Sequence, residues 1–140
     1  MDLTNRDSKL KNPQEDCELC QCYQEKEDVV FCNSHFFCKW DRYPVSQGHM
    51  LIVPKQHMAS FFALSLEEVS SLYQSIQKGK EIIEKNFAPT GYNLGVNLGR
   101  DAGQTISHLH IHLIPRYPGD VEDPEGGIRN VIPGKGKYRE

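Results

Sequence analysis

The apolar positions of the chain fall into several short runs of β-branched and aromatic residues and one long stretch with helical spacing. Short runs of this kind, bounded by Gly, Pro, Asn or Ser, are typical of strands. The uninterrupted run Met50–Val53, between Gly48 and Pro54, is typical of a strand buried on both faces. We expect five strands, over residues 29–31, 35–40, 50–53, 92–98 and 105–114.

Residues 65–86 predict a long helix. Ser65, followed three positions later by Glu68, forms a capping-box pattern, and Pro89 and Gly91 end the segment. Apolar residues near helical spacing predict one buried stripe, formed by Leu66, Val69, Leu72, Tyr73, Ile76, Ile82 and Ile83. Strands interrupted by one long helix indicate an α+β fold, with a mainly antiparallel sheet and the helix on one of its faces.

The two ends of the chain lack this patterning. Residues 1–14 are polar and show no apolar periodicity, so we expect a flexible N-terminal arm. Residues 118–140 are rich in Pro and Gly and predict an irregular C-terminal tail. The length of 140 residues fits a single domain, which we place at residues 15–117.

Composition and charge argue against several classes of protein. The chain has 16 basic and 19 acidic side chains and a formal net charge of −3, so it lacks the basic excess of a dedicated duplex-nucleic-acid binder. No apolar run approaches the roughly 18 residues that a membrane span needs. The polar N-terminus does not match a secretory signal. We therefore expect a cytoplasmic protein that binds neither duplex nucleic acid nor a membrane.

Three of the six histidines alternate with aliphatic residues in the last expected strand. In a strand, His108, His110 and His112 would share one face, while the intervening aliphatic residues enter the core. Residues 108 and 112 would lie about 13 Å apart, too far for all three rings to bind one ion through bonds of about 2 Å. A neutral imidazole is instead a nucleophile and a proton carrier near pH 7. The pattern therefore favours imidazole chemistry.

The histidines belong to a longer motif. His108-Leu-His-Ile-His-Leu-Ile114 follows Ala102-Gly-Gln-Thr105 and precedes Pro115-Arg116, and this arrangement resembles the signature of the histidine-triad (HIT) family. The resemblance extends upstream to Asp41, Gly48–Lys55 and Asn97, and covers about residues 17–117. It implies a five-stranded antiparallel sheet with one long helix and shorter helices, a homodimer, and a nucleotide hydrolase or nucleotidyl transferase.

By this resemblance, His110 is the nucleophile. It would attack the α-phosphorus of a dinucleoside polyphosphate or a nucleoside phosphoramidate and form a nucleotidyl-histidine intermediate. An uncharged imidazole suits this role because it avoids the repulsion between an anionic nucleophile and a phosphate. His112, one pleat along the same face, could donate a hydrogen bond to the phosphate oxygens or to the leaving group.

The resemblance also assigns residues that bind the nucleotide phosphate. It places Asn97, Gln104 and the Thr105 hydroxyl around the α-phosphate, together with His112. Gly103 lies in the same glycine-containing loop, which can expose backbone N–H groups to an anion. Judged without the resemblance, this loop is equally an ordinary hairpin connection.

Two further nucleotide-binding residues lie upstream. Asp41 matches the family position that accepts hydrogen bonds from the ribose hydroxyls, and His49 matches a histidine near the active site. From the residues alone, other interpretations stay open. Asp41 could cap a helix or pair with Arg42, and His49 could be a structural residue at the start of a strand.

Five cysteines lie in the first third of the chain, at positions 17, 20, 22, 32 and 38. An odd, clustered set fits a metal site or buried thiols better than a disulfide framework. Cys17-Glu-Leu-Cys20 is a CxxC pair, which by itself fits a redox motif or half of a zinc site, and Cys22 is a further possible ligand. No following helix is expected, which disfavours the redox motif. Cys32 and Cys38 fall in expected strands, where we expect them to be buried.

Some bacterial-type members of the resembled family complete a CxxC pair with the His of a Pro-Lys-x-His segment and the first His of the triad. This sequence has Pro54-Lys-Gln-His57 and His108 at those places. The resemblance therefore implies Zn²⁺ held by Cys17, Cys20, His57 and His108. Four protein ligands would make the site structural.

Two other functions stay open at the level of sequence. A zinc-dependent hydrolase would use His108, His110 and a third ligand to activate water. A non-catalytic nucleotide-binding or sensing module would keep the fold but perform no chemistry. The tail segment Gly126–Pro133 could close over a leaving group or lie in solvent, so the substrate and the base are left open.

Overall fold

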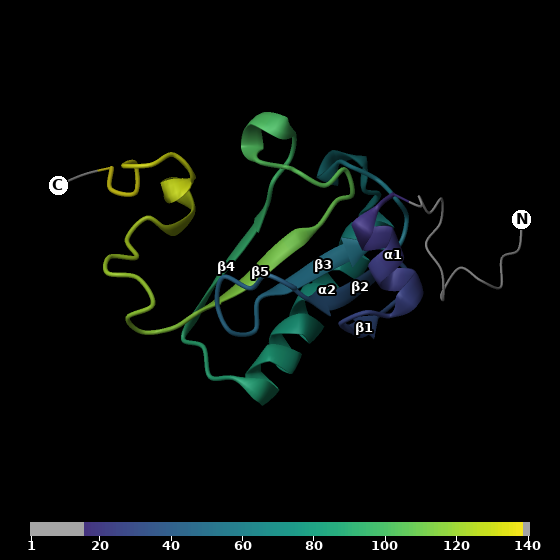
Figure 1. Ribbon diagram of the computed structural model, residues 1–140, viewed down its shortest axis with the longest axis horizontal. Helices are drawn as coiled ribbons and strands as arrows, with labels where there is room; N and C mark the ends of the chain where they lie inside the picture. Colours follow the sequence, from purple (N-terminus) through teal and green to yellow (C-terminus); the bar gives the residue numbers. More distant parts are fainter. Residues whose placement is uncertain (1–15, 139–140) are drawn as a thin grey trace, which may run out of the picture.

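The computed structural model describes residues 16–138, in which five strands form one antiparallel sheet (Figure 1). The strands are β1 (Val29–Cys32), β2 (Phe36–Trp40), β3 (Met50–Pro54), β4 (Gly91–Val96) and β5 (Ile111–Arg116). Their order is β1-β2-β3-β5-β4, so β3 and β5 are inner strands and β4 is an edge strand. The expected arm over residues 1–14 lies outside the described residues.

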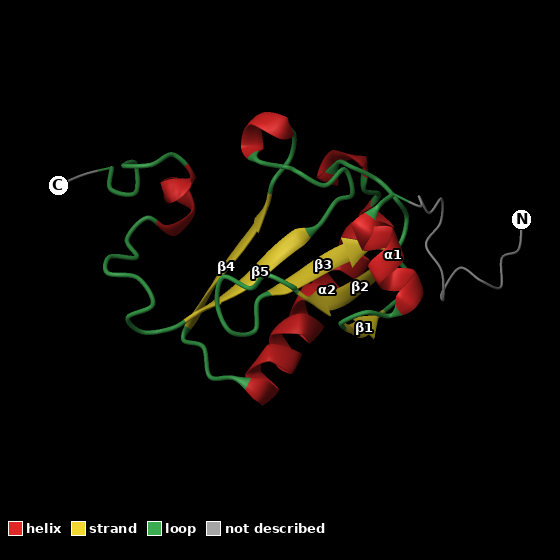
Figure 2. Ribbon diagram, viewed as in Figure 1, coloured by secondary structure: helices red, strands yellow, loops and turns green. Residues whose placement is uncertain are grey.

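Two helices cover opposite faces of the sheet (Figure 2). They are α1 (Glu18–Glu25) and α2 (Leu66–Asn86). Alternate residues of β2 enter different cores, since Phe36 packs with the residues of α2 and Phe37 with the residues of α1. β3 is buried along its whole length, as its uninterrupted apolar run predicts.

α2 spans the predicted segment and begins with the predicted capping box. The predicted apolar stripe is partly wrong, because its exposed members are Leu66, Val69 and Tyr73. The helix instead approaches the sheet through small residues, and a Cβ at Gly79 would lie 2.8 Å from Met50 Sδ. Close approach of the helix axis to the sheet, which needs small side chains, decides which face of α2 is buried.

The last strand begins later than predicted, at Ile111 and not at Thr105. β5 pairs with β3 from Ile111, which lies opposite Ile52. Extending this register toward residue 109 would bring the chain opposite Pro54, which has no N–H to donate. The alternation nevertheless continues upstream of the strand, because Leu109 is fully buried in the core with Ile111.

Two further features differ from the sequence predictions. A helix, α1, follows the CxxC pair, although none was expected there, and the Cys17 side chain accepts a hydrogen bond from the Cys20 N–H at its start. Cys38 is buried as predicted, whereas Cys32 is exposed because it ends the edge strand β1.

Short 3₁₀ helices complete the chain, at Phe61–Ala63 (η2), Arg100–Ala102 (η3) and Gly127–Val131 (η4). The expected irregular tail therefore contains one short helical turn, η4, which contacts β4. Among residues 16–138, no helix is long and apolar enough to cross a membrane.

Candidate active site and metal centre

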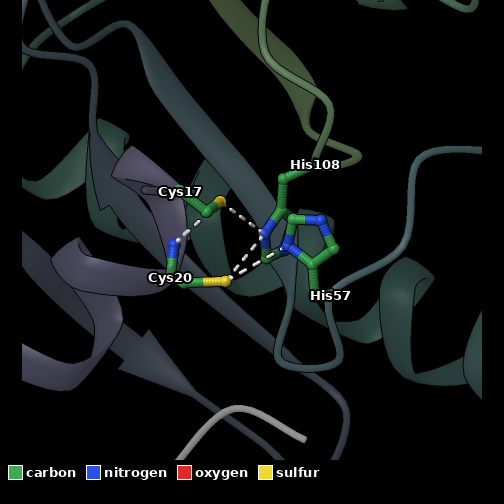
Figure 3. A group of neighbouring side chains, drawn as sticks. All are labelled: Cys17, Cys20, His57 and His108. Atoms are coloured by element: carbon green, nitrogen blue, oxygen red, sulfur yellow. Dashed lines mark hydrogen bonds between the residues drawn. The ribbon is translucent and has the colours of Figure 1, made fainter. Parts of the chain in front are cut away.

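Four side chains from three segments converge beside the start of α1 (Figure 3). Cys17 Sγ lies 3.3 Å from His108 Nδ1, and Cys20 Sγ lies 3.2 Å from Nδ1 of His57 and 3.5 Å from Nδ1 of His108. Both cysteines and His108 are buried, and His57 is partly buried. The structure thus brings together the four residues expected to bind metal.

The donor set and its spacing fit a tetrahedral ion. Sulfur at about 2.3 Å and nitrogen at about 2.05 Å from a zinc ion would lie about 3.5 Å apart at a tetrahedral angle. His108 Nε2 lies 2.9 Å from the Pro54 carbonyl, which only accepts, so His108 carries its proton on Nε2. Its Nδ1 lone pair therefore faces the sulfur atoms, as a metal ligand requires.

His110 is held by a hydrogen bond to the backbone. Its Nδ1 lies 2.8 Å from the His108 carbonyl oxygen, so Nδ1–H is the donor. In the neutral ring, Nε2 then carries the lone pair. No other protein group among residues 16–138 bonds to this ring, and no buried side-chain nitrogen there lacks a partner, so Nε2 is open to solvent. This is the arrangement of a nucleophile.

His112 lies beside His110 and continues into a chain of polar groups. The ring centroids of His110 and His112 are 5.2 Å apart. His112 Nδ1 lies 2.9 Å from His49 Nε2, and His49 Nε2 lies 3.4 Å from Asp41 Oδ2. The structure thus brings together four of the expected catalytic and nucleotide-binding residues.

Burial keeps His49 and His112 neutral. Burial, together with the neighbouring His110 and His49, lowers the pKa of His112 from 6.5 to about 4, against the opposing effect of Asp41. Burial also lowers the pKa of His49, again opposed by Asp41. Neither ring therefore carries a charge near pH 7.

We expect the stability of the protein to fall as the pH falls from about 6.5 to about 4. The unfolded chain binds a proton at residue 112 below its ordinary pKa of 6.5, whereas the folded protein binds it only near pH 4. For His112 alone this difference corresponds to at most about 3 kcal/mol. Thermal unfolding across this pH range measures the effect. His112→Asn, which does not titrate, should lose less stability than the wild type, and equal losses would contradict the assignment.

The side chain of Gln104, which is expected to bind phosphate, forms hydrogen bonds with other groups. Gln104 Oε1 accepts from the Gly99 N–H, and its Nε2 donates to the carbonyls of Ala59 and Ile106. The Gln104 side chain thus braces the loop itself. Gly103 takes a φ of +92°, which explains the glycine at that position.

The other two loop residues form no hydrogen bond with His110 among residues 16–138, although Asn97 directly follows Val96, which lies opposite Ile111. Asn97 is exposed just after β4. Thr105 lines a cavity of about 340 Å³ beside the metal-ligand cluster, together with Cys17, His57 and Ser107. No hydrogen bond joins Thr105 to His110 or His112 within residues 16–138.

The tail reaches the same face of the sheet as His112. Gly95 of β4 lies opposite His112 of β5, and opposed residues of antiparallel strands project to the same face. Ile128 Cδ1 lies 3.8 Å from the position that a Cβ on Gly95 would occupy. The sequence left the position of this segment open, and the structure places it next to the histidines.

Comparison with known families agrees with this geometry. Residues 23–119 match the family model of the HIT domain. The protein belongs to the HIT family. Its five-stranded antiparallel sheet with one long helix is the fold that the resemblance predicts for a HIT protein.

Several curated proteins are similar to this HIT protein. An uncharacterised HIT-like protein of Methanocaldococcus jannaschii is 38% identical over 104 residues, which are 74% of this chain and 80% of the relative. An asymmetrical bis(5′-nucleosyl)-tetraphosphatase of Schizosaccharomyces pombe is 36% identical over 57% of this chain and 44% of its own length. An AP-4-A phosphorylase of Mycobacterium tuberculosis is 32% identical over 74% of this chain and 54% of its own. The chain thus spans about half the length of these two enzymes.

Solved HIT structures share the fold. A HIT family protein from Bacillus anthracis superposes with a TM-score of 0.69 at 35% identity, covering 76% of this chain and 77% of the other. A zinc-bound histidine triad family protein from Mycobacterium smegmatis superposes with a TM-score of 0.67 at 26% identity, covering 75% of this chain and 78% of the other.

Proposed function

We propose that this HIT protein cleaves an α-phosphate bond of a dinucleoside polyphosphate or nucleoside phosphoramidate through a nucleotidyl-histidine intermediate on His110. The observation that carries the proposal is the hydrogen bond from His110 Nδ1 to the His108 carbonyl, 2.8 Å long, which directs a lone pair on Nε2 into solvent. The similarity to a tetraphosphatase and to an AP-4-A phosphorylase supports a nucleotide as the substrate.

The reaction has two steps on the same phosphorus atom. His110 Nε2 attacks the α-phosphorus, an N–P bond forms, and the bond to the leaving oxygen or nitrogen breaks. The leaving atom keeps the electron pair and, where it is nitrogen, takes a proton from solvent. The positive charge that develops on the His110 ring is stabilised because Nδ1–H already faces a carbonyl oxygen. Water then attacks the phosphorus, the N–P bond breaks, and a nucleoside monophosphate leaves with neutral His110 restored. An acceptor other than water gives nucleotidyl transfer.

The remaining roles concern binding. His112 donates a hydrogen bond to the phosphate or to the leaving group, and Asp41 accepts from the ribose hydroxyls. Backbone N–H groups near Gly103, with Asn97, Gln104 and Thr105, bind the phosphate. A homodimer is part of the proposal, since β4 is an edge strand that can pair with another chain.

We also propose that Cys17, Cys20, His57 and His108 hold Zn²⁺ in a structural role. The spacing of the four ligand atoms and the similarity to a zinc-bound relative support this. The ion would join the start of α1 to the segment just before the nucleophile. The zinc-dependent hydrolase considered from the sequence is not favoured, because the groups of possible metal ligands among residues 16–138 do not include His110.

A covalent intermediate is the direct test of this function. With a dinucleoside tetraphosphate labelled at the α-phosphorus, a rapid quench in base should trap label on the wild-type protein, and peptide mapping should place it on His110. A substrate with a chiral α-phosphorothioate should react with net retention, because two inversions occur. Steady turnover with net inversion and no labelled protein would instead show direct attack by water and refute the proposal.

A further inference from the structure

The loop between β2 and β3 folds back onto His49 and presents a backbone amide to its ring. The His49 N–H donates to the Ser46 carbonyl, at 3.2 Å, and the Val45 N–H donates to His49 Nδ1, at 3.1 Å. A backbone N–H can only donate, so Nδ1 of His49 must be the acceptor. The neutral ring of His49 therefore carries its proton on Nε2.

The proton on His49 Nε2 determines the tautomer of His112. His49 Nε2 lies 2.9 Å from His112 Nδ1, closer than its 3.4 Å separation from Asp41 Oδ2. Because His49 Nε2 is the donor, His112 Nδ1 accepts, and the neutral His112 ring carries its proton on Nε2. Both rings are neutral near pH 7, since burial lowers both pKa values.

The two neighbouring active-site rings are thus fixed in opposite tautomers. The His108 carbonyl leaves His110 with a lone pair on Nε2, and the Val45 amide, acting through His49, leaves His112 with an N–H on Nε2. One ring can attack phosphorus and the other can donate to an anionic oxygen. Neither can exchange roles with the other without breaking a hydrogen bond to the backbone.

We propose that the Val45 amide and the His49 ring are positioning groups that hold His112 as a hydrogen-bond donor toward the substrate. This inference rests on the proposed function and adds the origin of the donor. An imidazole free of such contacts interconverts between its two tautomers, so part of the time it would present a lone pair to the phosphate. A lone pair facing an anionic oxygen is repulsive. Fixing the tautomer in advance removes the fraction of molecules that would present this lone pair to the phosphate.

A metal ion bound by Asp41, His49 and His112 is the alternative explanation of this cluster. Their ligand atoms all lie within 4.8 Å of one another, and two histidines with one carboxylate are a known ligand set. The Val45 amide argues against it, because it occupies the Nδ1 lone pair of His49. Nε2, which faces the other two groups, is then protonated and has no lone pair for an ion.

Nitrogen NMR of the metal-loaded protein tests the inference without any substrate. Multiple-bond ¹H–¹⁵N spectra distinguish protonated from unprotonated ring nitrogens, and single-histidine variants assign them. We expect unprotonated Nδ1 atoms in His49 and His112 and an unprotonated Nε2 in His110. A protonated Nδ1 on either His49 or His112 would overturn the proposal. Because no turnover is involved, this result is independent of whether the proposed reaction occurs.

Two pairs of variants test whether the Val45 amide and the His49 ring set the tautomer of His112. Val45→Pro removes the amide donor, and its His112 signals should become an average of two tautomers. Val45→Ala keeps the amide and should keep the wild-type spectrum. If Val45→Pro leaves the spectrum unchanged, the amide does not set the tautomer.

The second pair replaces the His49 ring itself. It tests the proposal even if the Val45→Pro protein does not fold. The amide of His49→Gln can accept from Val45 and donate to His112, whereas His49→Leu can do neither. We expect kcat for a dinucleoside tetraphosphate to fall about 10- to 100-fold in His49→Leu and to recover in His49→Gln, with KM changing less. Equal kcat losses in both variants would contradict a positioning role. A wild type without turnover would refute the proposed function instead, and the spectra would still decide the tautomers.

Discussion

Replacing His110 with alanine is expected to lower kcat by at least about 10⁴-fold while leaving nucleotide affinity nearly unchanged. In the proposed reaction, Nε2 of this imidazole forms the bond to phosphorus, whereas the neighbouring His112 ring presents an N–H there. Binding should survive because the proposed ribose and phosphate contacts come from other residues. Single-turnover kinetics and calorimetric titration with a non-hydrolysable analogue measure the two quantities separately.

Two companion variants make this test specific. His112→Ala removes a donor and not the nucleophile, so a smaller loss of about 10²- to 10³-fold is expected. His35→Ala removes an imidazole just before β2, where it pairs with Glu67 and belongs to neither histidine cluster, and should retain full activity. If His110→Ala keeps more than a small fraction of wild-type turnover, another group is the nucleophile.

Removing the proposed zinc ion is expected to have the largest effect on stability. Structural zinc sites contribute on the order of 10 kcal/mol of apparent folding free energy. Losing even a third of this would lower the thermal midpoint of a domain of this size by about 10 °C. Chelation should therefore lower the midpoint by at least about that amount, and zinc added back should restore it.

The chain provides a matched control for the metal ligands. Cys20 is buried within the ligand cluster, and Cys20→Ser should reproduce the chelated state with less than one bound zinc per chain. Cys32 is exposed and lies outside the cluster, so Cys32→Ser should keep both the metal and the midpoint. Purified protein that contains no zinc and shows an unchanged midpoint under chelation would disprove the structural role.

Short-range sequence patterns predicted the elements whose structure is set within a single segment. β3 follows from an uninterrupted apolar run, and α2 follows from its capping box and its length. α1 was missed because it has eight residues and begins at a cysteine, which is not among the usual helix caps. The start of β5 was missed because Pro54, a residue of another strand, limits the pairing.

In the candidate site, too, features set within one segment were predicted, whereas contacts between segments were not. Alternation along residues 108–113 indicated which side chains enter the core, and the motif indicated which cysteines and histidines to group. No sequence pattern shows that the Val45 amide bonds to His49, because that contact depends on how one loop folds back. The exposure of Leu66 and Tyr73 could likewise not be predicted from the sequence, since it depends on how closely α2 approaches the sheet.

The tail after Asp120 is held together by its own contacts. A Cβ at Gly126 would collide with the backbone of Gly136, and a Cβ at Gly136 would collide with Asn130 Oδ1 and the Glu125 carbonyl. The Arg129 side chain donates to the Lys135 carbonyl, and Lys137 pairs with Asp123. The tail meets β4 mainly through η4, at Gly95 and Asn93. Its internal framework and its contact with the sheet therefore rest on different residues. Substituting side chains at its tip would reshape the surface beside His112 while β4 and β5 keep their sequence, so this segment can vary without disturbing the strands that carry the histidines.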